Sequence, residues 1–190
     1  MKYIKLLLVV ILILFSSSCS KYEELNDLSI ISNVEIKYKD NKYVVIMQEI
    51  IPKKNDNSFK YDYSYRTGTG RNIDSAFSNI IDHSPKTVYL KKIQNVVIEK
   101  KNHKKIINKF IRYQIKKENI SKNSSIIISN NSLKNIIKIN NDYKYIDSIL
   151  RKKKIILKDV LSKHKKNKRI RIPLLMIKNN EFVFKKYIYL

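Results

Sequence analysis

The most distinctive chemical group in this chain is its single thiol, which belongs to Cys19. A positively charged start with Lys2 and Lys5 is followed by an uncharged apolar run, residues 6–15, and then by three serines that lead directly into Cys19. The apolar run is shorter than the roughly 20 residues that a helix needs to span a bilayer, and this order is typical of an export signal. We therefore predict that residues 1–18 are a lipoprotein signal peptide, cleaved before a diacylated Cys19.

Acylation of Cys19 would decide both the location and the chemistry of the protein. Two or three acyl chains hold a protein on a bilayer far more firmly than one, at about 0.8 kcal/mol per buried CH₂, and an acylated thiol cannot serve as a nucleophile. We expect a lipid-anchored protein on the extracytoplasmic face of the membrane, with residues 19–29 as a lipidated linker. Two alternatives stay open: a signal-anchor helix, and a secreted protein in which the cysteine is incidental.

Carboxylates gather beside the expected anchor, at Glu23, Glu24 and Asp27, in a chain with only 16 acidic residues. Paired carboxylates can perform acid–base catalysis. In a short polar segment that leaves the membrane, however, helix capping or docking is the favoured role. We therefore expect these three residues to contact a partner protein.

The only glycines, Gly68 and Gly70, stand just before a helical pattern that begins near Ile73. A helix N-terminus offers free N–H groups to a phosphate. The segment Thr67 to Arg71 lacks the GxxxxGK[ST] and GxGxxG spacings of phosphate-binding loops. We therefore predict a structural role for both glycines, in a tight turn from strand to helix.

The residues that usually carry catalysis or metals are sparse and scattered. The three histidines, His83, His103 and His164, show no HExxH or HxH spacing, and the lone cysteine cannot complete a ligand set. A GxSxG nucleophile elbow is absent from the sequence. The sequence thus predicts a protein that is not an enzyme and that has no catalytic residues, metal or cofactor.

Basic residues are concentrated between Lys163 and Arg171. Such a run can grip phosphates, but it lacks the interleaved aromatic side chains on which bases stack. A solvated loop is the favoured interpretation, and a contact with anionic lipid headgroups is the alternative. Nucleic acid is not an expected partner, because the chain carries an export signal.

Composition limits how far the charge of the chain can be interpreted. There are 40 Lys and Arg residues against 16 Asp and Glu, which gives a formal net charge of +24. The abundance of Lys, Ile, Asn and Tyr matches AT-rich coding DNA, so part of this charge reflects codon usage. Weak attraction to anionic membranes follows in either case. With 190 residues, of which 43% are hydrophobic, the chain has enough apolar surface for one folded domain.

Hairpin signals appear at both ends of the chain that follows the anchor. Apolar runs at residues 30–38 and 42–51 flank Asp40-Asn41, and a second pair, 171–177 and 181–189, flanks Asn179-Asn180. We expect Pro52 to end the second strand, because it lacks a backbone donor. A polar loop over residues 53–60 and a strand over 61–65 should follow.

Between the hairpins, helical and strand patterns alternate. A helix is expected at residues 102–118, with Ile106, Ile107, Phe110, Ile111 and Ile115 on its inner face. The other expected elements are buried strands at 95–99 and 124–129, short helices at 132–137, 143–150 and 155–161, and a basic loop at 163–169. These patterns predict a single α+β domain over residues 30–190, with helices packed on a mixed β-sheet.

The order of these segments resembles the Ger(x)C family, the lipoprotein C subunits of spore germinant receptors. The segments that carry the resemblance are Cys19, Glu24 to Ile31, Lys42 to Pro52, Gly70 to Ala76, Ser84 to Glu99, Phe110 to Ser129 and Ser132 to Ile137. Their order and spacing match the N-terminal domain of that family over residues 20–188.

The resemblance implies a non-enzymatic C-type subunit of a membrane-bound receptor, acting in receptor assembly and in nutrient-triggered spore germination. It also implies partners, namely the other, polytopic membrane subunits of the receptor. The alternative function is that of a cell-envelope lipoprotein that binds a solute of unknown identity.

Overall fold

Three long antiparallel strands begin the part of the chain that the structure describes: β1 (Leu28–Lys39), β2 (Lys42–Asn55) and β3 (Ser58–Gly70). The structure is a computed structural model and describes residues 27–55, 58–132, 135, 146, 149–150, 153–179 and 181–190. The predicted hairpin around Asp40-Asn41 is confirmed, since β1 and β2 pair from Lys39↔Lys42 onward. Both turn residues have positive φ, 50° and 58°, as a two-residue hairpin turn requires.

The β2–β3 ribbon is longer than the sequence predicts. Pro52 does not end β2, and it pairs with Tyr61 in a ladder that continues to Asn55↔Ser58. The predicted loop over residues 53–60 is therefore wrong for its described part. Beyond Glu49, β2 pairs only with β3. A strand with one open edge tolerates proline, because no second neighbour needs its missing N–H.

The later elements alternate helix and strand, as predicted. They are α2 (Ile73–Asp82), β4 (Thr87–Tyr89), β5 (Asn95–Glu99), α3 (His103–Lys117), β6 (Ser125–Ser129), α6 (Leu157–Lys165), β7 (Arg171–Lys178) and β8 (Glu181–Tyr189). The second predicted hairpin is confirmed by the antiparallel pairing of β7 and β8.

All described strands join one mixed sheet in the order β3-β2-β1-β5-β6-β7-β8, with β4 pairing beside the start of β1. The neighbours β1, β5, β6 and β7 run parallel. Antiparallel strands β2 and β3 extend the sheet beside β1, and antiparallel β8 extends it beside β7. This arrangement confirms the α+β class with a mixed sheet.

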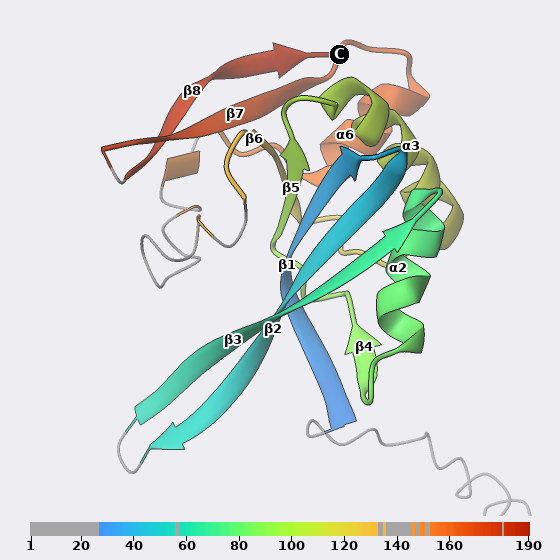
Figure 1. The fold of residues 1–190 in the computed structure, drawn as a ribbon. Coiled ribbons are helices and arrows are strands. Elements are labelled where there is room, and N and C mark those ends of the chain that lie inside the picture. Colours follow the sequence, from blue (N-terminus) through green and yellow to red (C-terminus); the bar gives the residue numbers. More distant parts are fainter. Residues whose placement is uncertain are drawn as a thin grey trace, which may run out of the picture.

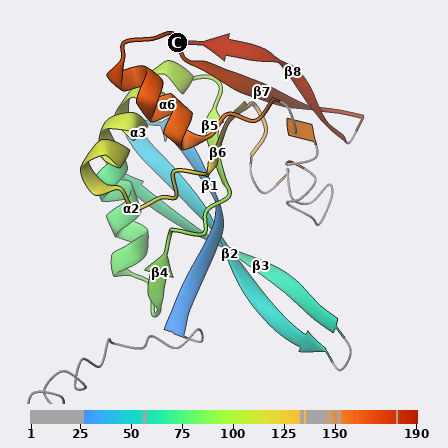
Figure 2. The ribbon, with the colours of Figure 1, turned by 180° about the vertical axis from the view of Figure 1, so that it is seen from behind.

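The three described helices cover one face of the sheet (Figure 1), and Figure 2 shows the same arrangement from behind. The core on this face is built around Phe77 of α2, Phe110 of α3 and the strand residues Val96 and Ile98. Between α2 and α3, Phe77 stacks on Tyr113 with ring centroids 4.9 Å apart. Burial raises the pKa of Tyr113 to about 12.

The opposite face of the sheet carries a second apolar cluster. Val97 of β5 and Ile127 of β6 belong to it, together with Leu175, Phe182 and Leu150. Because adjacent side chains in a strand point to opposite faces, β5 and β6 are buried on both sides, which explains why their sequences are continuous apolar runs.

Several predicted boundaries differ from the structure. Ile115 was expected inside but is 57% exposed, while Gln114 takes a buried position on α3. Helix α6 begins at Leu157 rather than Ile155 and continues through Lys165, so the first part of the predicted basic loop is helical. Strand β4 was not predicted. The helices expected at 132–137 and 143–150 lie mostly outside the described residues, as do residues 19–26 of the predicted lipidated linker.

Candidate functional site

The first described residues of the domain lie at one end of its sheet. Cys19, Glu23 and Glu24 lie outside the described residues, whereas Asp27 is described and is exposed, directly before β1 begins at Leu28. Figure 1 shows the start of β1 at the end of the sheet opposite the β1–β2 turn and the first turn of α3. An anchor that precedes Asp27 would therefore attach to this end of the domain.

Both glycines lie within β3 and have no positive φ. They permit a close approach of helix α2 rather than a tight turn. A Cβ on Gly68 would collide with the carbonyl oxygen of Ala76 and lie 2.6 Å from Cγ1 of Ile80. A Cβ on Gly70 would collide with Ser75 and lie 2.5 Å from the backbone nitrogen of Ala76. The role of both glycines is thus to let α2 pack directly on the strand.

Backbone N–H groups at the N-terminus of α2 are hydrogen-bonded by side chains of the same segment. The Asn72 side chain accepts a hydrogen bond of 2.7 Å from the Ser75 N–H, and Ser75 Oγ accepts one of 3.2 Å from the Asn72 N–H. This reciprocal pair is a capping box. It occupies donors that a phosphate-binding loop would leave free for a ligand.

A buried polar cluster joins strands β1, β2 and β5. The Asn95 side-chain amide donates to Asn33 Oδ1 at 2.8 Å, and the Asn33 amide donates to Gln48 Oε1 at 2.6 Å. Ser32 Oγ also donates to Gln48 Oε1, at 3.1 Å. The cluster lies beside a bulge between Ile31 and Asn33. Because buried amides must be paired, these bonds hold β1 and its neighbours in one register.

A charged pair lies next to this cluster. Glu49 Oε2 accepts hydrogen bonds from Ser64 Oγ at 2.9 Å and from Arg66 Nε at 3.1 Å. Burial alone would raise the pKa of Glu49, but the hydrogen bonds and the Arg66 charge outweigh burial and lower the pKa of this carboxyl below its usual value. The pair is therefore ionised at neutral pH and links β2 to β3.

A groove of about 640 Å³ runs between the C-terminal half of α3 and helix α6. Its apolar lining comes from Ile115 and Leu161. Its lining also includes Gln114, Glu118, Lys122, Lys158, Ser162 and Lys165. The three lysines are exposed, and we call them the cationic rim of the groove and Ile115 with Leu161 its apolar floor. The helical periodicity does not indicate this groove, because it predicts Ile115 to be in the core.

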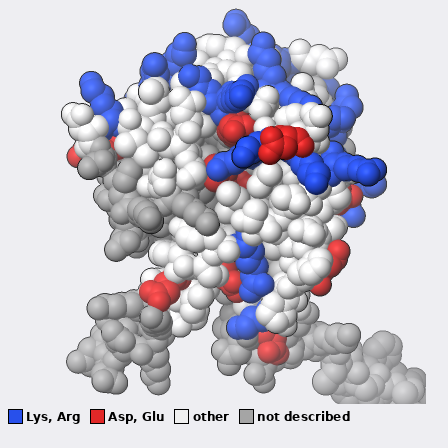
Figure 3. Space-filling view, viewed as in Figure 1, with Lys and Arg blue, Asp and Glu red and all other residues white. Residues whose placement is uncertain are grey.

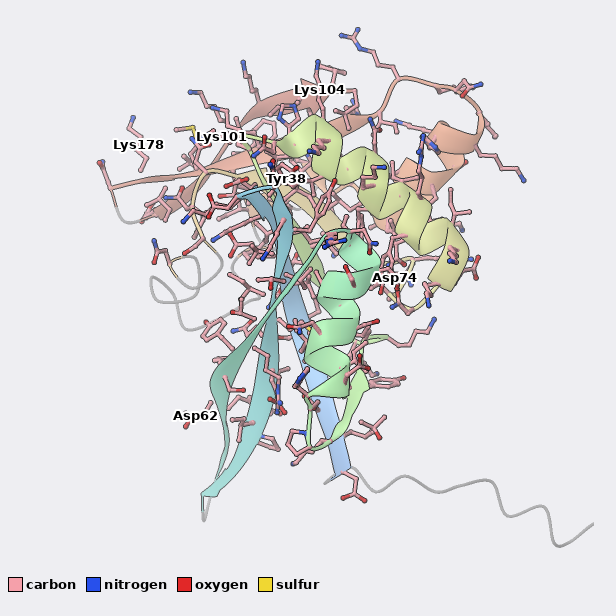
Figure 4. The ribbon with its side chains drawn as sticks, turned by 45° about the vertical axis from the view of Figure 1, so that its right-hand side comes forward. Tyr38, Asp62, Asp74, Lys101, Lys104 and Lys178 are labelled. Atoms are coloured by element: carbon pink, nitrogen blue, oxygen red, sulfur yellow. The ribbon has the colours of Figure 1, made fainter. Side chains whose placement is uncertain are left out.

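The outer surface of α3 and α6 is strongly basic. Exposed cations on these two helices and the loop after α3 are Lys104, Lys105, Lys109, Arg112, Lys116, Lys117, Lys122, Lys158 and Lys165. Figure 3 shows blue side chains gathered over the end of the molecule where α3 begins, and Figure 4 shows Lys101 and Lys104 at that end and Asp74 at the start of α2. Lys117 lies 3.7 Å from this aspartate. The helical layer thus offers a cationic surface with an apolar groove in it.

The histidines do not come together as a metal site. His83 Nδ1 lies 2.8 Å from the Asn79 carbonyl oxygen, and His103 Nδ1 lies 2.7 Å from that of Lys100. Within the described ranges no group of three or more His, Cys, Asp and Glu residues is placed to hold a metal ion. In the same part of the chain no helix has the length and apolar character needed to cross a membrane.

Comparison with known proteins gives one finding of similarity. A family model described as the spore germination protein N-terminal domain matches residues 21–171. No curated protein and no solved structure matches the chain. The matched range includes the glycines of β3, the buried polar cluster and all residues that line the groove between α3 and α6.

Proposed function

Because the chain belongs to the family of spore germination protein N-terminal domains, we propose that it is a non-enzymatic, C-type lipoprotein subunit of a spore germinant receptor. The observation that carries this proposal is the family match, which spans residues 21–171 of the 190 in the chain. In this role the protein takes part in receptor assembly and, through the receptor, in nutrient-triggered germination.

The proposed mechanism is scaffolding at the membrane surface. A lipid on Cys19 would confine the folded domain to the surface in which its partner subunits are embedded. Confinement raises the effective concentration of the domain for those partners without any new contact. The anchored end would place Glu23, Glu24 and Asp27 nearest to the bilayer, and we propose these carboxylates as contacts for a membrane subunit.

The role in germination is tested with spores that lack the gene. We expect nutrient-triggered germination to slow or stop, while a trigger that does not act through nutrient receptors still works. Restoring the wild-type gene should restore the response to nutrients. Unchanged nutrient germination in the deleted strain would contradict the proposal.

The anchor is tested separately with the Cys19→Ser variant. Cells grown with a palmitate analogue should label the wild-type protein and leave the variant unlabelled. If the variant labels like wild type, the lipid is not on Cys19. A variant that is unlabelled and yet germinates normally would separate the receptor role from anchoring.

A further inference from the structure

The groove between α3 and α6 has the dimensions of a binding site. Its volume of about 640 Å³ lies within the usual range of ligand sites, roughly 300–1,000 Å³. The two helices form its walls, with Ile115 contributed by α3 and Leu161 by α6. Ile115 is 57% exposed, although it lies on a helix whose neighbouring isoleucines Ile107 and Ile111 are fully buried. The floor therefore offers apolar surface to an occupant.

The charges around the groove specify the occupant further. Lys158 and Lys165 are exposed on α6, and neither forms a salt bridge within the described residues. The single acidic lining residue, Glu118, is already engaged, because its carboxylate accepts from Lys122 at 3.3 Å and its carbonyl oxygen accepts from Lys91. The rim is thus cationic and would complement an anionic partner.

The spacing of the α6 lysines fits a helical partner. Lys165 follows Lys158 by seven positions in the helix, which places them about 10.5 Å apart along the axis, or roughly two turns. A second helix lying along the groove would present carboxylates two turns apart to these lysines. Its apolar ridge would then rest on Ile115 and Leu161, as ridges pack into grooves between helices.

A membrane surface fits this site less well. The apolar side chains line a concave groove, and the lysines stand at its rim. A flat bilayer cannot follow a groove between two helices, whereas another helix can lie along it. From the apolar lining, the cationic rim and the lysine spacing, we propose that the α3–α6 groove binds an acidic amphipathic helix of a partner protein. The inference deepens the proposed function, because such a helix would belong to another receptor subunit, but its binding test does not depend on germination.

The test uses the full chain in detergent micelles and two synthetic helical peptides of about five turns, roughly 18 residues. Both carry leucines at i, i+3, i+4 and i+7; one is flanked by glutamates and the other by lysines. We expect the glutamate peptide to bind at least tenfold more tightly, to weaken as salt is added and to shift the methyl NMR signals of Ile115 and Leu161. Equal binding of the two peptides, or shifts confined to another surface, would overturn the proposal.

Matched variants locate the contact. Ile115→Glu should weaken binding of the glutamate peptide at least tenfold, whereas Ile81→Glu, at an isoleucine of α2 that is 38% exposed, should leave it unchanged. The pair of changes Lys158→Glu and Lys165→Glu should reverse the preference toward the lysine peptide, while Lys109→Glu on the outer side of α3 should not. Equal effects of the groove and control variants would contradict a specific site.

A membrane site is the competing outcome, and it is tested with vesicles rich in phosphatidylglycerol. If Ile115→Glu weakens binding of the full chain to these vesicles and does not affect the peptide, the groove is a lipid contact and the proposal is wrong. Peptide binding that persists in a protein whose deletion leaves germination unchanged would reject the receptor role and retain the groove as a helix-binding site.

Discussion

The exclusion of a side chain at Gly68 is a consequence of helix packing. The carbonyl oxygen of Ala76 occupies the position that a Cβ would need, and this oxygen belongs to the backbone and cannot rotate away. We expect Gly68→Ala to destabilise the protein by roughly 1–3 kcal/mol, the usual cost of overpacking. Denaturant unfolding measures the change. Thr69→Ala, at the exposed residue between the two glycines, should have a small effect, and an equally small effect at Gly68 would contradict the close packing.

The ionised Glu49 makes the free energy of unfolding depend on pH. Its pKa is lowered in the folded protein from the usual value of 4.5, so its contribution is complete above that value and is lost as the pH falls through the folded pKa. Glu49→Gln should reduce stability at neutral pH by about 1 kcal/mol, because Arg66 and Ser64 lose a charged acceptor. Unfolding midpoints of wild type and variant should converge as the pH falls below 4.5. Glu118→Gln, at an exposed carboxylate, serves as the control.

At the scale of elements, the β1–β2 turn imposes a positive φ of 58° on Asn41. Asparagine and glycine accept this conformation, whereas a β-branched residue does so only with strain of roughly 1–2 kcal/mol. We therefore expect Asn41→Val to lower the free energy of unfolding by about that amount and Asn41→Gly to be tolerated. Thermal unfolding of the two variants provides the comparison, and equal midpoints would show that the turn does not determine the pairing of these strands.

The hairpins could be predicted because their signals are local. Asp40-Asn41 stands between two β-forming runs, and the turn and the strands it joins are neighbours in the chain. The length of β2 could not be predicted in this way. Proline has no N–H, so Pro52 would end β2 only if a second neighbouring strand needed a donor at this position. Within the described residues, the absence of such a strand follows from the end of the β1–β2 pairing at Glu49.

The groove could not be predicted for a related reason. The periodicity of α3 shows which residues are apolar, but it does not show how wide a surface its neighbours cover. Ile111 is fully buried, while Ile115, one turn further on, is left in the groove against α6. The two helices are distant in the sequence, so their contact depends on the order of the strands between them. The glycines of β3 are the only two in the sequence, but the reason for them lies in the packing of α2.

At the scale of the whole molecule, strand order is the property that local patterns specify least. Strands β1, β5, β6 and β7 run parallel in the centre of the sheet, and their contacts join residues far apart in the chain. The continuous apolar runs of β5 and β6 indicate burial on both faces. The same order places α2, α3 and α6 on one face (Figure 1). The cationic surface and its groove are formed by α3 and α6 of this layer.

Removal of residues 1–18 takes away Lys2 and Lys5 and leaves 38 basic residues against 16 acidic ones, a net charge of +22. This charge and the proposed lipid should hold the protein on a membrane in two separable ways. Attraction between lysines and anionic headgroups is screened within about 10 Å at 0.1 M salt, whereas burial of acyl chains is not screened. On anionic vesicles at low salt, both the lipidated wild type and a Cys19→Ser variant produced without residues 1–18 should sediment with the lipid. Raising the salt to about 1 M, where screening acts within about 3 Å, should release the variant and leave the wild type bound. Uncharged vesicles are the control, since they should retain the wild type and not the variant. Release of both proteins by salt would mean that charge alone holds the domain at the surface and that Cys19 carries no anchor.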